Sequence, residues 1–238
     1  MQRIDAPEIL DSDECTLCDT QAALRVIGRI NRWFGGIATT QNMVERVARA
    51  TAVNHFSLLE VASGLGEVPR TVGKNLENHG ITLDITLLDV ARSHLPHVPA
   101  GATNHERKNR GVVGDALSLP FEDNSFDLVS CSLFAHHLNP ARLMRFLNES
   151  LRVSRRALLI NDLIRDPLHL ALVYASFPIM LNRVAWLDGL TSVRRAYTLS
   201  EIRHALNAAF TETLLPQVEL SRHYLFRMGV IVWKRPVG

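Results

Sequence analysis

Apolar and polar residues follow one period near the start of the chain and another in the rest. Up to about residue 52, apolar side chains recur every three or four positions, which places them on one face of a helix. The first such face contains Ala23, Val26, Ile27, Ile30, Trp33 and Phe34. Gly35-Gly36 would end this helix, and a second helix is predicted to begin near Thr40.

From residue 53 onward, short apolar segments alternate with segments of helical period. The expected strands cover residues 56–61, 81–88, 111–115, 125–134, 155–162, 212–220 and 224–233. This alternation is typical of a doubly wound, mostly parallel sheet. The break around Ser221-Arg222 suits a hairpin, so the last strand is expected to be antiparallel. We therefore predict an α/β fold, a Rossmann-like doubly wound seven-stranded sheet with N-terminal helices and an apolar helical lid.

The longest apolar tract runs from Leu168 to Leu187 and contains Pro178, Asn182 and Arg183. Its clean apolar runs are too short to cross a bilayer, which takes about 20 residues. The tract is predicted as a buried or lid helix, with a contact to a membrane surface as the alternative. We expect residues 1–52 to form an N-terminal helical cap, residues 53–238 the main domain, and residues 166–197 a lid insertion.

Composition and charge narrow the class of protein. Hydrophobic residues make up 47% and charged residues 21% of the 238 residues, as in ordinary soluble domains. The net charge of +2 is too balanced to indicate a nucleic-acid partner. The first residues contain no apolar signal-peptide region, so we expect a cytoplasmic protein without stable membrane insertion.

The cysteines indicate neither a disulfide framework nor a metal centre. Cys15 and Cys18 form a single C-x-x-C motif, and Cys131 stands apart from them. A structural zinc ion takes four ligands, and no second C-x-x-C or matching histidine pair follows. We expect reduced thiols and no bound metal.

The stretch LLEVASGLGEVP, from Leu58 to Pro69, predicts a buried strand, a glycine turn and the start of a helix. Gly64 and Gly66 would let a ligand approach the backbone closely. A nucleoside triphosphate would need a Lys followed by Ser or Thr, and a dinucleotide would need a third glycine where Pro69 stands. Glu67 would repel a pyrophosphate at the helix N-terminus. The cationic S-adenosylmethionine meets none of these objections.

Acidic residues end three successive predicted strands. Glu60 suits a cationic ligand with an ammonium group. Asp89 lies about twenty residues after the glycines, where an acid accepts ribose hydroxyls, and Asp115 could accept the adenine amino group. A strand-end acid alone is often a cap or turn residue, but three in this order favour a cofactor site.

These segments resemble the class I S-adenosylmethionine-dependent methyltransferases, specifically the UbiE-like small-molecule group. The resemblance is carried by LLEVASGLGEVP, by LLDVA from Leu87, by GDALSLPFEDNSFDLVSCSLFAHHL from Gly114 and by LLINDL from Leu158. It implies that residues 53–238 are a methyltransferase domain. It also implies a set of cofactor contacts: Glu60, Ala62, Ser63, Gly64 and Gly66 at the methionine and ribose, Asp89 and Val90 at the ribose and adenine, Asp115 and Ala116 at the adenine, and Ser132 beside the cofactor. The main departure is Ala62, where the family more often has glycine.

The acceptor side is predicted from a histidine pair. FAHHL would place His136 and His137 after the fourth strand, near the methyl group. Histidine titrates near neutral pH and suits deprotonation of a hydroxyl. By resemblance, this pair and Asp162 line the acceptor pocket. One histidine could instead pack inward, so which of the two is the base stays open.

The expected function is transfer of a methyl group from S-adenosylmethionine to a small apolar or aromatic acceptor, such as a phenol or polyketide. The alternatives are a quinone or lipid methyltransferase at the membrane surface and a non-catalytic S-adenosylmethionine-binding protein. We expect a monomer or homodimer that acts on a small-molecule acceptor.

Overall fold

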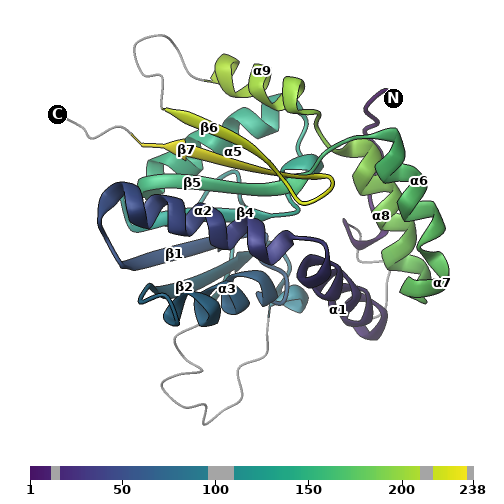
Figure 1. The fold of residues 1–238 in the computed structure, drawn as a ribbon, viewed down its shortest axis with the longest axis horizontal. Helices are drawn as coiled ribbons and strands as arrows, with labels where there is room; N and C mark the ends of the chain where they lie inside the picture. The colour runs from purple at the N-terminus through teal and green to yellow at the C-terminus, as the bar shows by residue number, and fades with distance from the viewer. Residues whose placement is uncertain (12–16, 96–109, 210–216, 235–238) are drawn as a thin grey trace.

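In the computed structural model, which describes residues 1–11, 17–95, 110–209 and 217–234, a seven-stranded sheet runs through the centre of the molecule (Figure 1). The strands are β1 (His55–Val61), β2 (Thr82–Asp89), β3 (Arg110–Val113), β4 (Phe126–Ser132), β5 (Ser154–Leu163), β6 (Val218–His223) and β7 (Arg227–Trp233). Their order across the sheet is β3-β2-β1-β4-β5-β7-β6. The first five are parallel, and β7 is antiparallel to both β5 and β6. The predicted fold class, including the antiparallel last strand, is confirmed.

Two helix layers cover the faces of this sheet (Figure 1). One layer contains α2 (Gly36–Thr51) and α3 (Glu67–Glu77), and the other contains α5 (Pro140–Val153) and α9 (Leu199–Ala209). These helices bury apolar residues against the sheet; in α3 they include Val68, Val72 and Leu76. In the first predicted helix, Trp33 and Phe34 are exposed, although the apolar period had placed them on its apolar face. Asn139 begins α5 because its side chain accepts a hydrogen bond from the Arg142 N–H. The two resulting cores hold the strands in register.

The start of α2 differs from the sequence expectation. The helix begins at Gly36 rather than near Thr40. Gly35 adopts a left-handed conformation with φ of 77°, which lets the chain turn at once from α1 (Leu17–Trp33) into α2. Thr40 is fully buried within the helix, where its hydroxyl accepts a hydrogen bond from Asn161 Nδ2 at 2.8 Å. Thr40 thus packs against β5 within the helix and does not mark its start.

Other boundaries shift by a few residues. After β2 the chain forms a single 3-10 turn, η2 (Arg92–His94). The strand expected over 212–220 begins at Val218, and the first part of that prediction lies outside the described residues. The predicted C-x-x-C pair also lies there, since residues 12–16 and the Cys18 side chain are not described.

The apolar tract folds into three short helices instead of one. These are α6 (Pro167–Ala175), α7 (Phe177–Met180) and α8 (Arg183–Arg195). Leu181 turns left-handed with φ of 50°, and Asn182 then caps α8 by accepting a hydrogen bond from the Ala185 N–H. In the described part of the chain, no helix is long and apolar enough to cross a membrane.

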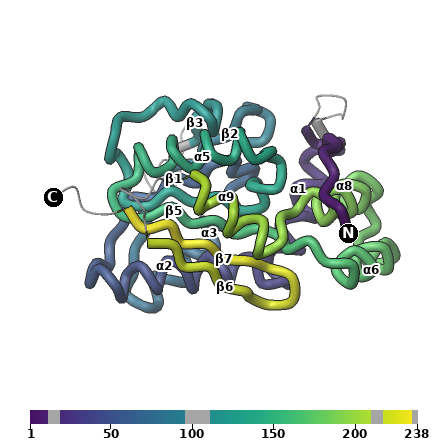
Figure 2. The backbone as a smooth tube through the Cα atoms, turned by 90° about the horizontal axis from the view of Figure 1, so that it is seen from above, coloured from purple at the N-terminus to yellow at the C-terminus, as the bar shows by residue number. Residues whose placement is uncertain are grey.

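One end of the molecule gathers α1, α6, α8 and the N-terminal segment beyond the carboxyl ends of the parallel strands (Figure 2). Residues 1–11 run to a 3-10 turn, η1 (Ile9–Asp11), that packs on α8. Asp188 on α8 accepts hydrogen bonds from the backbone N–H groups of Ile9 and Leu10. Arg3 donates to the backbone carbonyls of His136 and Leu138. The N-terminal segment is therefore fixed against the edge where ligands bind in such sheets.

Candidate active site

A cavity of about 1090 Å³ lies at this end of the sheet. Ligand cavities for one drug-sized molecule run to about 300–1,000 Å³, so this one has room for a cofactor and a second molecule. The residues that line it come from the N-terminal segment, α1, the loop after β1, the turn after β4 and α6–α8. They join the predicted cofactor loop and the histidine pair in one space.

The loop after β1 has the backbone conformation that the glycine turn predicted. Ala62, Gly64 and Gly66 all have positive φ, at 52°, 51° and 69°. A Cβ on Gly66 would lie 2.5 Å from Cδ1 of Leu87, so this position requires glycine. Ala62, Ser63 and Gly64 line the cavity, whereas Gly66 shapes the turn behind it. Ala62 therefore adopts the left-handed conformation that glycine more often supplies here.

Asp89 ends β2 directly beside this loop. Its Oδ2 accepts a hydrogen bond from the Gly64 N–H at 2.9 Å, and its Oδ1 accepts one from the Ala91 N–H at 3.2 Å. Asp89 and Val90 both line the cavity, and the Val90 side chain is exposed there. Asp89 thus fixes the two turns between which a ribose would lie.

Glu60 is a buried carboxyl at the floor of the cavity. It is 1% exposed, and its Oε2 has no hydrogen-bond partner among the described residues. Burial raises the pKa of Glu60 to about 7, although the Ser130 and Ser132 hydroxyls on β4 act in the opposite direction. Ser132 also lines the cavity. Glu60 is an acceptor that a cationic amino group would satisfy.

Asp115 and Ala116 lie just after β3 but are not among the described residues that line the cavity. Asp115 is exposed, and its Oδ1 accepts a hydrogen bond from the Leu117 N–H at 2.8 Å. This is the turn role that a strand-end acid often has. Contact of these two residues with adenine stays a prediction.

His136, which lines the cavity, forms a buried pair with Asp162 behind it. Asp162, at the end of β5, is fully buried, and its Oδ1 lies 2.7 Å from His136 Nδ1. Burial opposes a charge on the ring, but Asp162 and Glu8 outweigh it and raise the pKa of His136 to about 10. His136 therefore holds its proton at neutral pH in the ligand-free protein. His136 and Asp162 hold one another in this buried pair, and their role in catalysis stays a prediction.

His137 lies on the cavity side of η3 (Ala135–His137) and is 21% exposed. Its Nδ1 is 2.9 Å from Oδ1 of Asp11, and its Nε2 is 3.6 Å from Oε2 of Glu8. His137 stacks on Phe134. His137 is the more exposed of the two histidines, with 21% of its side chain exposed against 2% for His136, and its role toward an acceptor stays a prediction.

Glu8 and Asp11 were not found by sequence reasoning. Both come from the N-terminal segment, which the sequence analysis left without an element. Ser192 Oγ donates to Glu8 Oε1 at 2.8 Å, and Arg195 Nη1 donates to Asp11 Oδ2 at 2.8 Å, so α8 holds both carboxylates in place. The one signal for them in the sequence is the spacing of Glu8 and Asp11, two acidic residues three positions apart that precede the first helix.

Comparison with known proteins agrees with this geometry. Residues 59–157 match the family model of the Methyltransferase domain. A demethylmenaquinone methyltransferase of Thermotoga maritima is 30% identical over 107 residues, which are 44% of this chain and 41% of that protein. A ubiquinone/menaquinone biosynthesis C-methyltransferase UbiE of Dinoroseobacter shibae is 35% identical over 101 residues, 41% of this chain and 38% of that protein. The chain spans about two fifths of the length of these curated relatives.

Solved structures show the same fold at lower identity. The plantazolicin methyltransferase BpumL, in complex with a triazolic desmethylPZN analog and SAH, superimposes with a TM-score of 0.68 at 12% identity, covering 95% of this chain and 93% of that chain. An S-adenosylmethionine-dependent methyltransferase from Aquifex aeolicus superimposes with a TM-score of 0.51 at 16% identity, covering 80% of this chain and 89% of that chain.

The sheet order and the glycine loop agree with the fold of the class I S-adenosylmethionine-dependent methyltransferases, and residues 59–157 match the Methyltransferase domain. The two curated relatives support the resemblance to the UbiE-like group over the part of the chain that they match.

The described residues fit the cofactor of this class. Glu60 offers a buried acceptor without a partner, and Gly66 keeps the loop close to Leu87, where a Cβ would force it away. Ser63 and Gly64 present backbone to the cavity beside Asp89. When bound, S-adenosylmethionine supplies the methyl group; Glu60 would hold its amino group and Asp89 its ribose.

Replacing Asp89 by alanine should weaken binding of S-adenosylhomocysteine by about 1–3 kcal/mol. The carboxylate fixes Gly64 and Ala91 and lines the cavity, so its loss leaves these groups and the ribose hydroxyls unpaired. Calorimetric titration gives the change in affinity. Asp84→Ala is the matched control, because Asp84 lies on the same strand but is exposed and pairs with His55. Unchanged affinity would show that Asp89 only caps the turns.

Affinity for S-adenosylhomocysteine should rise with pH. Glu60 stays protonated up to about pH 7 in the ligand-free protein, and the ligand's ammonium group favours the carboxylate. Binding below pH 7 therefore releases a proton, so affinity should rise about tenfold per pH unit between about pH 5 and 7 and then level off. The neighbouring Cys131 thiol does not contribute, since burial raises its pKa well above the usual value.

Calorimetry in buffers of different ionisation enthalpy counts the released proton directly. Glu60→Gln serves as the control because it keeps the shape of the side chain but removes its titration. An affinity of the unmodified protein that stays flat over this pH range contradicts the assignment of Glu60.

Proposed function

We propose that this protein transfers a methyl group from S-adenosylmethionine to a small apolar or aromatic acceptor, at a hydroxyl of a phenol or polyketide-type metabolite. One observation carries this proposal. The cavity that contains the cofactor loop continues to a cluster of imidazole and carboxylate groups, formed by His136, His137 and Glu8. Cofactor and acceptor could therefore meet in one closed space.

The walls on the acceptor side support an apolar acceptor. They include Trp33, Phe34, Leu172, Ile179, Met180 and Phe226. Pockets that are mostly apolar with a few polar groups orient small hydrophobic ligands. A fold neighbour was solved with a triazolic desmethylPZN analog, and an apolar product of secondary metabolism is the kind of acceptor that this wall would accommodate. Residues 166–197, as α6–α8, would act as the lid.

The chain's own residues would mainly position the acceptor. Methyl transfer needs the acceptor oxygen held in line with the methyl group, and positioning supplies much of the rate. His137 would hold the hydroxyl and, with Glu8 and Asp11, help it lose its proton. His136 and Asp162 would fix the turn that carries His137, because the Asp162 carboxylate accepts the His136 backbone N–H at 2.9 Å.

A screen with isotope-labelled S-adenosylmethionine against phenols, quinones and polyketides tests this proposal. We expect labelled product from phenols or polyketides together with S-adenosylhomocysteine. Cofactor binding without transfer to any acceptor class would instead favour a non-catalytic S-adenosylmethionine-binding protein. Binding of NAD with no binding of S-adenosylhomocysteine would overturn both the methyltransferase proposal and the non-catalytic alternative.

A second candidate is methylation of a quinone at a membrane surface. It is favoured by exposed apolar side chains on α6 and α7, where Leu168 is 61%, Ile179 77% and Leu181 83% exposed. The curated relatives are named as menaquinone-pathway methyltransferases. These side chains lie at the lid, so a membrane could deliver the acceptor to the cavity.

We expect the protein to stay in the supernatant when it is sedimented with phosphatidylethanolamine/phosphatidylglycerol vesicles. The lid helices pack on one another, with Trp186 donating a hydrogen bond to the Val173 carbonyl and contacting Phe177. They do not need a bilayer to be ordered. Co-sedimentation that is lost in the Ile179→Glu, Leu181→Glu variant would favour the quinone candidate instead.

A further inference from the structure

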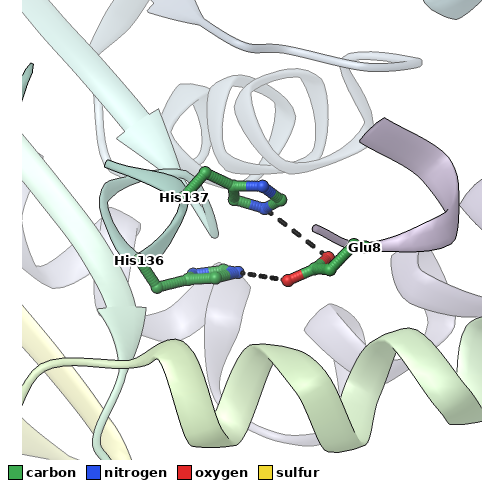
Figure 3. A group of neighbouring side chains, drawn as sticks. All are labelled: Glu8, His136 and His137. Atoms are coloured by element: carbon green, nitrogen blue, oxygen red, sulfur yellow. Dashed lines mark ion pairs between the residues drawn. The ribbon is translucent and has the colours of Figure 1, made fainter. Parts of the chain in front are cut away.

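Two imidazole rings and one carboxylate converge at the acceptor side of the cavity (Figure 3). Nε2 of His136 lies 3.3 Å from Oε1 of Glu8, and Nε2 of His137 lies 3.6 Å from Oε2 of the same carboxylate. Hydrogen bonds between nitrogen and oxygen are about 2.7–3.2 Å long. The His136 Nε2 atom is buried and has no hydrogen-bond partner among the described residues. The three groups face one another as two ion pairs, with separations longer than an ordinary hydrogen bond.

The opposite nitrogen of each ring is held by a different carboxylate. His136 Nδ1 lies 2.7 Å from Oδ1 of Asp162, and His137 Nδ1 lies 2.9 Å from Oδ1 of Asp11. A carboxylate behind Nδ1 fixes the ring and directs the Nε2 lone pair forward, and this arrangement accompanies histidines that bind metals. Both histidines of the cluster have a carboxylate beside Nδ1.

The distances suit an ion placed between the three groups. In a tetrahedral site with bonds of about 2.0–2.1 Å, neighbouring ligand atoms lie about 3.3–3.4 Å apart. The separations of 3.3 Å and 3.6 Å end on different oxygens of Glu8, and the first is close to this value. With one ligand atom from each residue, the three atoms lie within 4.8 Å of one another. A small contraction would bring them around one cation.

The charge around the cluster is also suitable. Three carboxylates lie within the cluster or directly behind it: Glu8, Asp11 and Asp162. The nearby cation Arg195 pairs mainly with Asp11, because its Nη1 is 2.8 Å from Asp11 Oδ2 and 3.9 Å from Glu8 Oε1. Three carboxylates therefore surround two imidazole rings, and this arrangement favours a cation.

We propose that Glu8, His136 and His137 bind one divalent transition-metal ion, with its fourth position open to the cavity. Two imidazoles and a carboxylate suit Zn²⁺ and related ions, whereas Mg²⁺ and Ca²⁺ take mainly oxygen ligands. The open position faces the space where the acceptor hydroxyl would lie. A catalytic use of the ion, to favour the ionised hydroxyl, rests on the proposed function; the binding site itself does not.

Titration of the full chain with Co²⁺ and Zn²⁺ tests the site. A Cys15→Ser, Cys18→Ser background removes the thiols of the C-x-x-C pair, which could bind either ion themselves. In this background we expect one equivalent of Zn²⁺ by elemental analysis after dialysis, and the visible absorption of tetrahedral Co²⁺ without a thiolate charge-transfer band. Binding that disappears in this background overturns the proposal.

Substitutions then locate the ion. Glu8→Gln and His137→Gln should each weaken Zn²⁺ binding more than about 100-fold, and Asp11→Asn about 10–100-fold, as is usual for a group behind a ligand. His204→Gln is the control, because His204 is exposed on α9 away from the cavity. Circular dichroism and S-adenosylhomocysteine binding confirm that the variants fold. Absence of binding, or binding unchanged in Glu8→Gln and His137→Gln, overturns the assignment.

The same preparations separate this proposal from the proposed function. Methyl transfer by metal-free protein that equals transfer by metal-loaded protein would leave the function standing and remove any catalytic role for the ion. One bound equivalent at the three residues without transfer to any acceptor would leave the metal site standing and count against the function.

Discussion

Replacing Asp162 by alanine should lower the free energy of unfolding by about 3–5 kcal/mol. The Asp162 carboxylate is fully buried and accepts hydrogen bonds from the backbone N–H groups of His136 and Leu163 and from the His136 ring. Removing it leaves the buried imidazole and two backbone donors without partners. Single domains are stable by only about 5–15 kcal/mol, so urea denaturation would show a large shift of the midpoint.

A surface pair provides the control for this prediction. Asp123 also pairs with a cation, Arg152, at 2.8 Å, but its side chain is 69% exposed. Asp123→Ala should change stability by less than about 1 kcal/mol, because exposed ion pairs contribute little. If Asp162→Ala unfolds the chain outright, Asp162→Asn keeps one acceptor and should give a measurable intermediate loss. Equal effects of the buried and exposed substitutions would contradict the assignment of Asp162 as a positioning residue.

The fold could be predicted because it depends on periodic burial. Helices and strands that lie on the sheet repeat their apolar positions at the spacing of their own geometry. The predicted start of α2 was wrong because the decisive feature is the left-handed turn at Gly35, which an apolar period does not record. The lid was predicted as one segment, but Asn182 begins a new helix within it.

The cofactor side of the site was predicted better than the acceptor side. Glu60 and Asp89 lie at strand ends, and the topology of a parallel sheet brings strand ends together. Glu8 and Asp11 reach the same cavity from an irregular segment, through contacts with α8 and η3 that no spacing in the sequence records. For the same reason, no spacing in the sequence indicates a metal site. Its only metal-like motif was the C-x-x-C pair.

The N-terminal segment, residues 1–11, contacts the turn that carries His136 and His137. Arg3 holds the backbone of the histidine turn, and Glu8 and Asp11 face the rings of that turn. The groups that would handle the acceptor's proton are thus assembled only when residues 1–11 pack on α8. Cofactor binding and acceptor chemistry therefore depend on different segments, which makes them separable by substitution.

His137→Ala should lower kcat for a hydroxyl acceptor by about 10²–10⁴-fold, the usual contribution of a group that assists proton loss. His137 is the histidine on the cavity side, and without its ring Glu8 faces the acceptor alone. Affinity for S-adenosylhomocysteine should stay within about twofold, because Glu60, Gly64 and Asp89 are untouched; a change that spares binding and lowers kcat removes an interaction made in the transition state. Steady-state kinetics with saturating cofactor measures this effect.

His204→Ala is the matched control, since it removes an exposed histidine from α9 and should leave kcat unchanged. The His137 effect should also depend on the acceptor. An acceptor that reacts as a preformed anion needs no help in losing a proton, so His137→Ala should lower its kcat far less than that of a neutral phenol. If His137→Ala lowers kcat by the same factor for both acceptors, His137 only positions the acceptor. If kcat is unchanged for both, alignment with the methyl group suffices, and the histidine pair has no part in proton loss.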